Sequence, residues 1–201
     1  LNYILGNPPF IGSNLMTSEM RMELRSTMPE VPNTGLLDYV SAWYVKTLKI
    51  MKSNPLVEAA LVSTNSITQG EQVGVLWKYL VEQGVHINFA HQPFKWSNDA
   101  KGNAAVDCVI VGYSLKNNKQ KYLFEYKDIR SEPILESVDN ISPYLVDSKT
   151  TFLKSRTLPI SSVSNIRKGN YYAKSEGLII EDADYQSFIE KEPSAKKYIK
   201  L

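Results

Sequence analysis

The chain has 201 residues, of which 43% are hydrophobic and 22% charged, and it carries 10 glycines and 10 prolines. Such a composition excludes disordered, collagen-like and coiled-coil proteins. One cysteine excludes a disulfide framework and a Cys-rich zinc site, and two histidines leave little for a His-based centre, so we predict no metal. No apolar run approaches the roughly 18 residues that a membrane span requires, so we predict no membrane segment.

The first part of the chain alternates predicted strands and helices. Residues 3–6 predict a short strand that ends at Asn7-Pro8-Pro9. Ser18 is a suitable cap for a short helix that runs towards Thr27. Between Leu36 and Met51, apolar residues recur at three- and four-residue spacing, which predicts a buried amphipathic helix.

The following segments extend the same pattern. The apolar run 57–62 predicts a strand buried on both faces. Thr68 and Glu71 match a capping box for a helix that ends near Gln83. Residues 85–90 and 104–113 predict two further strands, and because no helical periodicity separates them we expect an antiparallel hairpin. The predicted fold class is therefore α/β: the C-terminal half of a doubly wound, Rossmann-like sheet with an antiparallel last strand.

The pattern changes after residue 115. Residues 122–126 predict one more strand, prolines then break the chain into short segments, and residues 182–199 predict a short helix. We therefore divide the chain into a catalytic, base-binding half (1–115) and an irregular α+β region (116–201). The second region would connect to target recognition, or begin it.

Charge is distributed unevenly between these regions. Residues 1–114 carry 8 basic and 9 acidic side chains, whereas residues 115–201 carry 15 and 12. The stretch 148–175 contains six basic residues and no acid. It is either a solvated surface or a surface that contacts phosphates, and composition alone does not decide between the two.

The most informative motif is Asn7-Pro8-Pro9-Phe10, at the predicted carboxyl end of a strand. Open α/β sheets bind ligands at that end. Prolines have no N–H, so the turn presents the Asn7 amide oxygen and the Pro8 carbonyl as acceptors. Phe10 adds a flat apolar face. Such a turn suits a planar ring with an exocyclic amino group, because two acceptors take both N–H hydrogens and a neutral Asn buries no charge.

This tetrapeptide resembles motif IV of S-adenosylmethionine-dependent amino-methyltransferases, chiefly DNA adenine-N6 methyltransferases. Three longer stretches resemble MmeI-type bifunctional restriction-modification enzymes and their relatives: LDYVSAWYVK, STNSITQGEQVGVLW and FAHQPFKWSNDAKGNAAVDCVIVGY. The resemblance extends over most of residues 1–160. It implies S-adenosylmethionine as cofactor, double-stranded DNA as partner, a bacterial cytoplasmic location, and a nuclease domain or subunit as a further candidate partner.

The resemblance also implies residue roles. Asn7 and Pro8 would hydrogen-bond the amino group of the target adenine, and Asn7 would also lie next to the cofactor. Phe10 would stack on the base, which must leave the duplex to be reached. Phe94 sits where the family has a second base-packing aromatic, in the loop before the antiparallel strand, and Trp96 is the second candidate for that role. The alternative for Phe94 is an ordinary core aromatic.

Several polar and basic residues have weaker expected roles. Asn65 and Ser66 could touch the base or the cofactor. For DNA backbone contacts we single out six cations, each of which has a solvated surface position as its alternative: Lys95, Lys101, Lys154, Arg156, Arg167 and Lys168.

Other chemically capable residues are expected to be structural. Cys108 lies within the apolar run 106–111, so it is expected in the core, and cytosine-C5 chemistry, which needs a nucleophilic cysteine, is excluded. His86 and His91 lie on or beside a predicted strand without a carboxylate spaced as a partner.

The family's main cofactor-binding motifs are missing. These are a Gly-rich turn after a first strand and an acid after the second, and the ten glycines here are scattered. In the family's motif order both precede the Asn-Pro-Pro turn. Because the chain starts at Leu1 in an apparent strand, we expect a fragment that begins at motif IV, and we expect it alone to be inactive.

Three other functions remain open from the sequence. Amino-methylation of cytosine at N4 shares the motif. Glutamine methyltransferases acting on release factors usually carry Asn-Pro-Pro-Tyr, and they end soon after the last strand, unlike this chain. A non-catalytic DNA-binding specificity module would use residues 115–201 beside a vestigial pocket.

Overall fold

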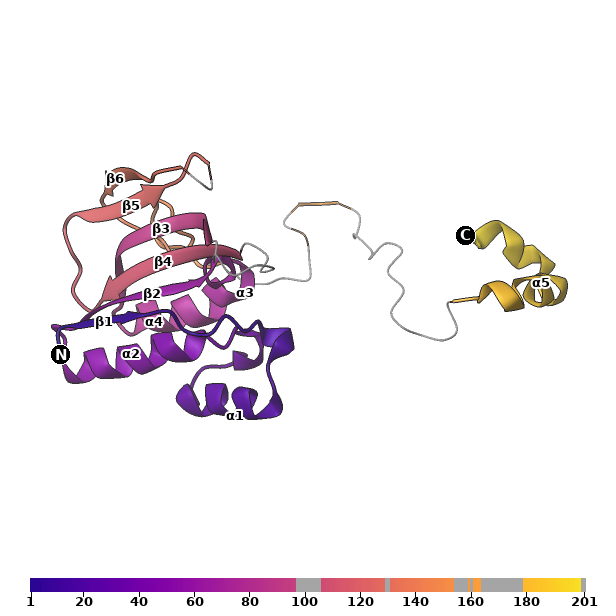
Figure 1. Cartoon of the computed structure of the whole chain (residues 1–201), viewed down its shortest axis with the longest axis horizontal. Helices are drawn as coiled ribbons and strands as arrows, with labels where there is room; N and C mark the ends of the chain where they lie inside the picture. Colours follow the sequence, from indigo (N-terminus) through magenta and orange to yellow (C-terminus); the bar gives the residue numbers. More distant parts are fainter. Residues whose placement is uncertain (97–105, 129–130, 154–158, 160, 164–178, 200–201) are drawn as a thin grey trace. The chain divides into compact units, whose positions relative to one another are not determined.

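The computed structural model describes residues 1–96, 106–128, 131–153, 159, 161–163 and 179–199. The chain divides into two compact units, Leu1–Ser155 and Arg156–Leu201. The first contains a sheet with helices (Figure 1). The described part of the second contains α5 (Asp182–Lys191) and a 3-10 segment (Pro193–Tyr198), where a short helix is predicted.

Six strands form one mixed sheet in the first unit. Their bounds are β1 (Tyr3–Gly6), β2 (Glu58–Thr64), β3 (His86–Trp96), β4 (Val106–Ser114), β5 (Lys121–Glu125) and β6 (Ile134–Val138). The spatial order is β1-β2-β4-β3-β5-β6. β1 and β2 are parallel, as are β3 and β5, while β4 is antiparallel to both β2 and β3. The α/β class and the antiparallel hairpin are confirmed.

Four α-helices lie in the N-terminal part: α1 (Ser18–Thr27), α2 (Ser41–Ser53), α3 (Gly70–Gln72) and α4 (Lys78–Glu82). One π-helical turn (Val73–Trp77) joins the last two. The first helix is capped by Thr17 rather than Ser18, because the Thr17 hydroxyl accepts the Met20 N–H. The capping box at Thr68 is wrong: its hydroxyl donates to the Asn65 carbonyl within a separate 3-10 turn.

The start of α2 is also later than predicted. Leu36 belongs to a 3-10 turn (Thr34–Leu36) and is 48% exposed, so the apolar pattern there includes a residue that does not face the core. From Ser41 onward the predicted buried stripe is present: Tyr44, Leu48 and Met51 are fully buried.

An aromatic cluster joins the helices to the sheet. Tyr44 of α2 stacks on Tyr113 of β4 with ring centroids 5.3 Å apart, and Trp77 packs edge-on against both rings. Both α2 and the helical segment 70–82 therefore pack on one face of the sheet, the arrangement visible in Figure 1. The other face is less covered, since alternate residues of β2 are only partly buried. The prediction of a strand buried on both faces is wrong for this reason.

Gly112 allows an unusually close approach between the two central strands. A Cβ built at Gly112 of β4 would lie 2.1 Å from the ring of Phe89 on β3. The ring therefore lies across the space that any larger residue would need.

The sheet continues beyond residue 115. β5 pairs with β3 and β6 pairs with β5, so both strands extend the sheet that carries the motif. The assignment of residues 116–201 to target recognition stays a prediction. None of the described helices is long and apolar enough to cross a membrane.

Candidate active site

The Asn7-Pro8-Pro9-Phe10 turn lies directly after β1, as predicted. Asn7 is exposed, and its side-chain amide has no hydrogen bond among the described residues. Pro8 is buried and Phe10 is partly buried. β2 and β3 run in the same direction as β1, so their carboxyl ends lie at the same end of the sheet.

An open hollow of about 490 Å³ lies at this end of the sheet. Its walls come from the segment after the motif, the turn before α2, the loop after β2 and the start of β4. The lining residues are Phe10, Gly12, Ser13, Asn14, Leu15, Asp38, Thr64, Asn65, Ser66, Val106 and Asp107. The structure therefore brings Phe10 together with Asn65 and Ser66, as the sequence predicts, whereas Asn7 and Pro8 lie outside the lining.

Two carboxylates that were not predicted as site residues, Asp38 and Asp107, line the hollow. Asp38 accepts hydrogen bonds from the Ser13 N–H at 2.9 Å and from the Ser66 hydroxyl at 2.7 Å. The only sequence signal for it is a lone acid within an otherwise mostly apolar stretch (36–45). Asp107 lies beside a segment outside the described residues and carried no comparable signal.

Lys95, one of the predicted DNA contacts, is paired with a protein carboxylate. Its Nζ lies 2.6 Å from Oδ1 of Asp107, and both side chains are about one-third exposed. Asp107 lines the hollow, and the ion pair is partly exposed to solvent. The role of Lys95 as a phosphate contact stays a prediction.

Phe94 lies within β3, opposite Cys108 on β4, and not in a loop. Its ring stacks on Tyr126 with centroids 5.3 Å apart. Tyr126 in turn shares a 2.8 Å hydrogen bond with Nδ1 of His91, whose ring stacks on Phe124 at 4.2 Å. Phe94 is thus part of an aromatic cluster over β3 and β5 and does not line the hollow.

The side chains of the remaining predicted site residues lie outside the described part of the chain. The side chain of Trp96 lies outside the described part, although its backbone ends β3. Five of the six predicted DNA contacts also lie outside the described residues: Lys101, Lys154, Arg156, Arg167 and Lys168.

The nucleophile and histidine assignments agree with their surroundings. Cys108 is buried, and burial together with the charge of Asp107 raises the pKa of its thiol, which disfavours a thiolate nucleophile. Burial lowers the pKa of both histidines, and for His86 the nearby charge of Lys121 lowers it further. Both imidazoles are therefore neutral at neutral pH.

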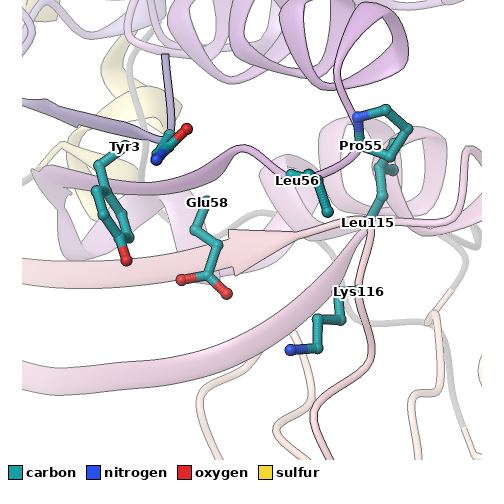
Figure 2. A pocket seen from close by; sticks show the side chains of 7 residues that line it. Tyr3, Pro55, Leu56, Glu58, Leu115 and Lys116 are labelled. Carbon is teal, nitrogen blue, oxygen red and sulfur yellow. The ribbon is translucent and has the colours of Figure 1, made fainter.

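A second hollow, of about 420 Å³, lies at the opposite end of the sheet. Figure 2 shows Tyr3 and Glu58 from the starts of β1 and β2 beside Pro55 and Leu56, with Leu115 and Lys116 following β4. This is the amino end of the parallel strands, and the motif is absent from its lining. We therefore take the hollow beside Phe10 as the candidate active site, because that one combines the strand ends, the motif and a polar wall.

Comparisons with known proteins show the family of the chain. Residues 1–125 match the model of the family described as MmeI, DNA-methyltransferase domain. The chain is 41% identical over 199 residues to DNA methyltransferase A of Bacillus subtilis strain 168, covering 98% of this chain and 22% of that protein. It is 42% identical to the type IIL restriction-modification enzyme MmeI, solved in complex with DNA, with a TM-score of 0.85.

The match to the MmeI structure covers 98% of this chain and 26% of that one. The chain thus spans about a quarter of the length of the relatives that it matches. The family model covers more than half of the present chain, and it includes the motif, the hollow and strands β1 to β5. The chain belongs to the MmeI DNA-methyltransferase domain family.

Proposed function

We propose that this chain is the base-binding part of a DNA methyltransferase that transfers a methyl group from S-adenosylmethionine to the exocyclic N6 of adenine. The observation that carries the proposal is the Asn-Pro-Pro-Phe turn at the carboxyl end of β1, whose Phe10 lines a hollow with polar walls. The two relatives described above, a DNA methyltransferase and an enzyme solved with DNA, support it.

The turn suits an amino group as methyl acceptor. Asn7 is exposed and its amide oxygen has no competing partner among the described residues, so it is free to accept an N–H from a ligand. With the Pro8 carbonyl as second acceptor, both amino hydrogens are bound and the nitrogen lone pair is directed towards the methyl group. Attack would then be direct and in line, with the new N–C bond forming as the S–C bond of the sulfonium breaks and the nitrogen losing one proton, and the protein contributes positioning and electrostatics.

Phe10 holds the base in this arrangement. A base inside a duplex cannot reach the turn, so the target nucleotide must rotate out of the stack into the hollow. There the Phe10 ring offers a stacking surface, and Asn65 offers hydrogen bonds to the base edge, while the hydroxyl of Ser66, which also lines the hollow, is bonded to Asp38 and Thr64. Phe94 and Trp96 remain proposed second aromatic contacts.

S-adenosylmethionine would supply the methyl group as a sulfonium. The described residues contain no Gly-rich turn after a strand, so they do not fit the whole cofactor. We assign to this chain the acceptor side of the reaction, with Asn7 next to the cofactor. We expect the isolated chain to bind the cofactor weakly and to leave DNA unmethylated.

DNA binding would rest on cations around the hollow and in the later, basic stretch. Lys95 is the one of the six proposed contacts whose side chain is described, and it is paired with Asp107, which lines the hollow. A restriction-modification role, with a nuclease elsewhere in the full-length protein, follows by analogy with MmeI and belongs to the same proposal.

The test is to identify the product. The full-length natural protein is incubated with DNA and isotope-labelled S-adenosylmethionine, and the nucleosides are resolved by mass spectrometry. We expect label in N6-methyladenine. Label in N4-methylcytosine would overturn the choice of base, and label in glutamine of an added release factor would overturn the choice of polymer. DNA binding with no methylation would indicate the specificity-module alternative.

A further inference from the structure

Three hydrogen bonds hold the segment that follows the motif. Pro8 and Pro9 donate no backbone hydrogen bonds, so the turn needs anchors further along. The Ile11 carbonyl accepts the Tyr39 N–H at 2.9 Å, and the Ser13 carbonyl accepts from the Arg21 guanidinium at 2.6 Å. The Ser13 N–H donates to Oδ1 of Asp38 at 2.9 Å. Residues 38 and 39 therefore anchor the loop that carries Phe10.

The same carboxylate also reaches the opposite wall of the hollow. Oδ2 of Asp38 accepts the Ser66 hydroxyl at 2.7 Å, and the Ser66 Oγ lies 2.8 Å from the Thr64 Oγ1. Ser66 follows β2, whereas Ser13 follows β1. One side chain, only 9% exposed, thus links the two loops that face each other across the candidate base pocket.

Asp38 is itself held in place by the helix behind it. Its backbone N–H donates to Oε1 of Gln72 at 3.3 Å, and Nε2 of Gln72 donates to the Leu36 carbonyl at 3.2 Å. Gln72 is buried. A carboxylate whose backbone is fixed in this way has few alternative positions, and hydrogen bonds to a charged acceptor are about twice as strong as neutral ones.

We propose that Asp38 is a positioning residue for methyl transfer: its carboxylate fixes the spacing between the motif loop and the Ser66 loop, and so the place of Phe10 and Asn7 relative to the target base. The inference rests on the proposed function. Asp38 acts through its loops and not on the reacting atoms. Its effect should be large, because a misplacement of about 1 Å in an in-line reaction can cost on the order of 100-fold in rate.

The network predicts a graded series of variants in the full-length protein. Asp38→Ala removes both links, and we expect kcat to fall by about 100-fold. Ser66→Ala removes one link, and we expect a fall of about fivefold to tenfold, in line with a single hydrogen bond to a charged group. KM for DNA and the affinity for DNA should change by less than about threefold, because neither side chain is at a phosphate contact in the proposal.

Asp38→Asn is the conservative rescue. Its amide oxygen can accept the Ser13 N–H, and its amide N–H₂ can donate to the Ser66 Oγ, which then donates to Thr64. We expect it to recover most of the kcat that the alanine variant loses. Glu30→Ala is the matched control: it removes a carboxylate that accepts the Tyr79 hydroxyl, away from the hollow, and should leave kcat unchanged within about twofold.

Two further readouts separate positioning from general damage. Hydrogen exchange should lose protection in Asp38→Ala at residues 11–15 and 65–68, but not in β2 or α2. A duplex with 2-aminopurine at the methylated position should show a changed fluorescence in Asp38→Ala, because the flipped base no longer stacks on Phe10 as in the wild type.

The outcomes are distinguishable. A wild type that leaves DNA unmethylated contradicts the proposed function, while the hydrogen-exchange pattern still tests the bridge. A methylating wild type with Asp38→Ala no slower than Glu30→Ala overturns the positioning role. If Asp38→Ala unfolds, the test of the positioning role rests on Ser66→Ala and Asp38→Asn. Equal kcat in Ser66→Ala and the wild type would refute the link between the two loops through Asp38 and Ser66.

Discussion

The two ends of the sheet carry hollows of similar volume but different construction. At the carboxyl end, about 490 Å³ is enclosed by loops whose backbones are tied together through Asp38 and Ser66. At the amino end, about 420 Å³ is bordered by strongly exposed apolar side chains, with Leu56 81% and Tyr3 67% exposed. The loops of the first hollow are fixed by hydrogen bonds to a carboxylate. The second hollow lies between the starts of β1 and β2 and the residues that follow β4.

The comparison shows that volume does not distinguish the candidate active site from the other hollow. The carboxyl end differs in the direction of its strands. Because β1 and β2 are parallel and β4 is antiparallel to β2, the motif, the loop after β2 and the start of β4 lie at the same end of the sheet. Each end also carries an asparagine next to β1, Asn7 after it and Asn2 before it, and an aromatic residue, Phe10 and Tyr3. These pairs serve as matched controls for one another.

The first prediction compares an aromatic residue at each end, Phe10 after β1 and Tyr3 at its start. Phe10→Ala should lower kcat/KM for methylation by about 10- to 100-fold, because stacking of a base on an aromatic ring is worth about 1–3 kcal/mol. Tyr3→Ala removes a more exposed ring at the other end and should stay within about twofold of the wild type. Steady-state kinetics on the full-length protein would measure both, and equal losses would argue against a base site at Phe10.

The second prediction concerns a substitution in the two central strands of the sheet, which should affect both ends of the sheet equally. Gly112→Ala places a Cβ against the Phe89 ring and should destabilise β3 and β4 by roughly 1–3 kcal/mol. Hydrogen exchange in those strands would report the change. Gly35→Ala, whose nearest neighbour is an Arg25 side chain at 4.0 Å, is the control.

A suppressor tests the cause of that destabilisation. Phe89→Ala combined with Gly112→Ala removes the clash, so the double variant should be no less protected than Phe89→Ala alone. A further loss of protection in the double variant would mean that Gly112 is needed for another reason, such as its backbone.

The third prediction compares a cation at each end. Lys95→Ala should weaken DNA binding by about threefold to tenfold and reduce the salt slope by about one, as for a single phosphate contact. Lys116→Ala, at the amino end, should leave both quantities unchanged. Titrations at several salt concentrations measure the two slopes. An unchanged slope for Lys95→Ala would mean that Lys95 pairs with Asp107 and does not contact a phosphate.

The smallest expected effect concerns the two histidines of β3. Both have a pKa lowered from the ordinary value of 6.5, His86 through burial and Lys121, and His91 through burial alone. Lys121→Gln should therefore raise the pKa of His86 and leave that of His91 unchanged. Hydrogen exchange at the imidazole C2 positions, followed by mass spectrometry against pH, would measure each value; equal shifts in both would contradict this separation.

The same lowered values set the sign of the pH dependence. Below pH 6.5 the unfolded chain binds more protons at these histidines than the folded chain does. Their contribution to stability is therefore present above that pH and is lost as the pH falls through the folded-state pKa. Protection of β3 against hydrogen exchange should decrease in acid, and an increase would contradict the assignment.

Much of the sheet and the motif could be predicted from the sequence because the signals are local. Strand runs, the Asn-Pro-Pro-Phe turn and the lack of helical periodicity between residues 90 and 104 each depend on neighbouring residues in the sequence. The predicted buried stripe of α2 was also right from Ser41 onward. Its start was wrong at Leu36, because periodicity does not distinguish a helix from a preceding 3-10 turn.

The parts that could not be predicted depend on long-range contacts. Asp38 accepts a hydrogen bond from Ser66, 28 residues later, and no local sequence pattern predicts that contact. Phe94 was expected in a loop, yet β3 continues through it because β4 pairs opposite at Cys108. The two-sided burial expected for residues 57–62 failed because α2 and the helical segment 70–82 cover one face.

The most direct test of the account replaces Asn7 and Asn2 by alanine separately. The two amides lie on either side of β1, and both are exposed. Asn7→Ala in the full-length protein should abolish methylation, to below about one-thousandth of the wild-type rate, since it removes one of two acceptors for the reacting amino group. It should leave DNA affinity nearly unchanged, and Asn2→Ala should methylate normally. Surviving methylation in Asn7→Ala would contradict the central claim.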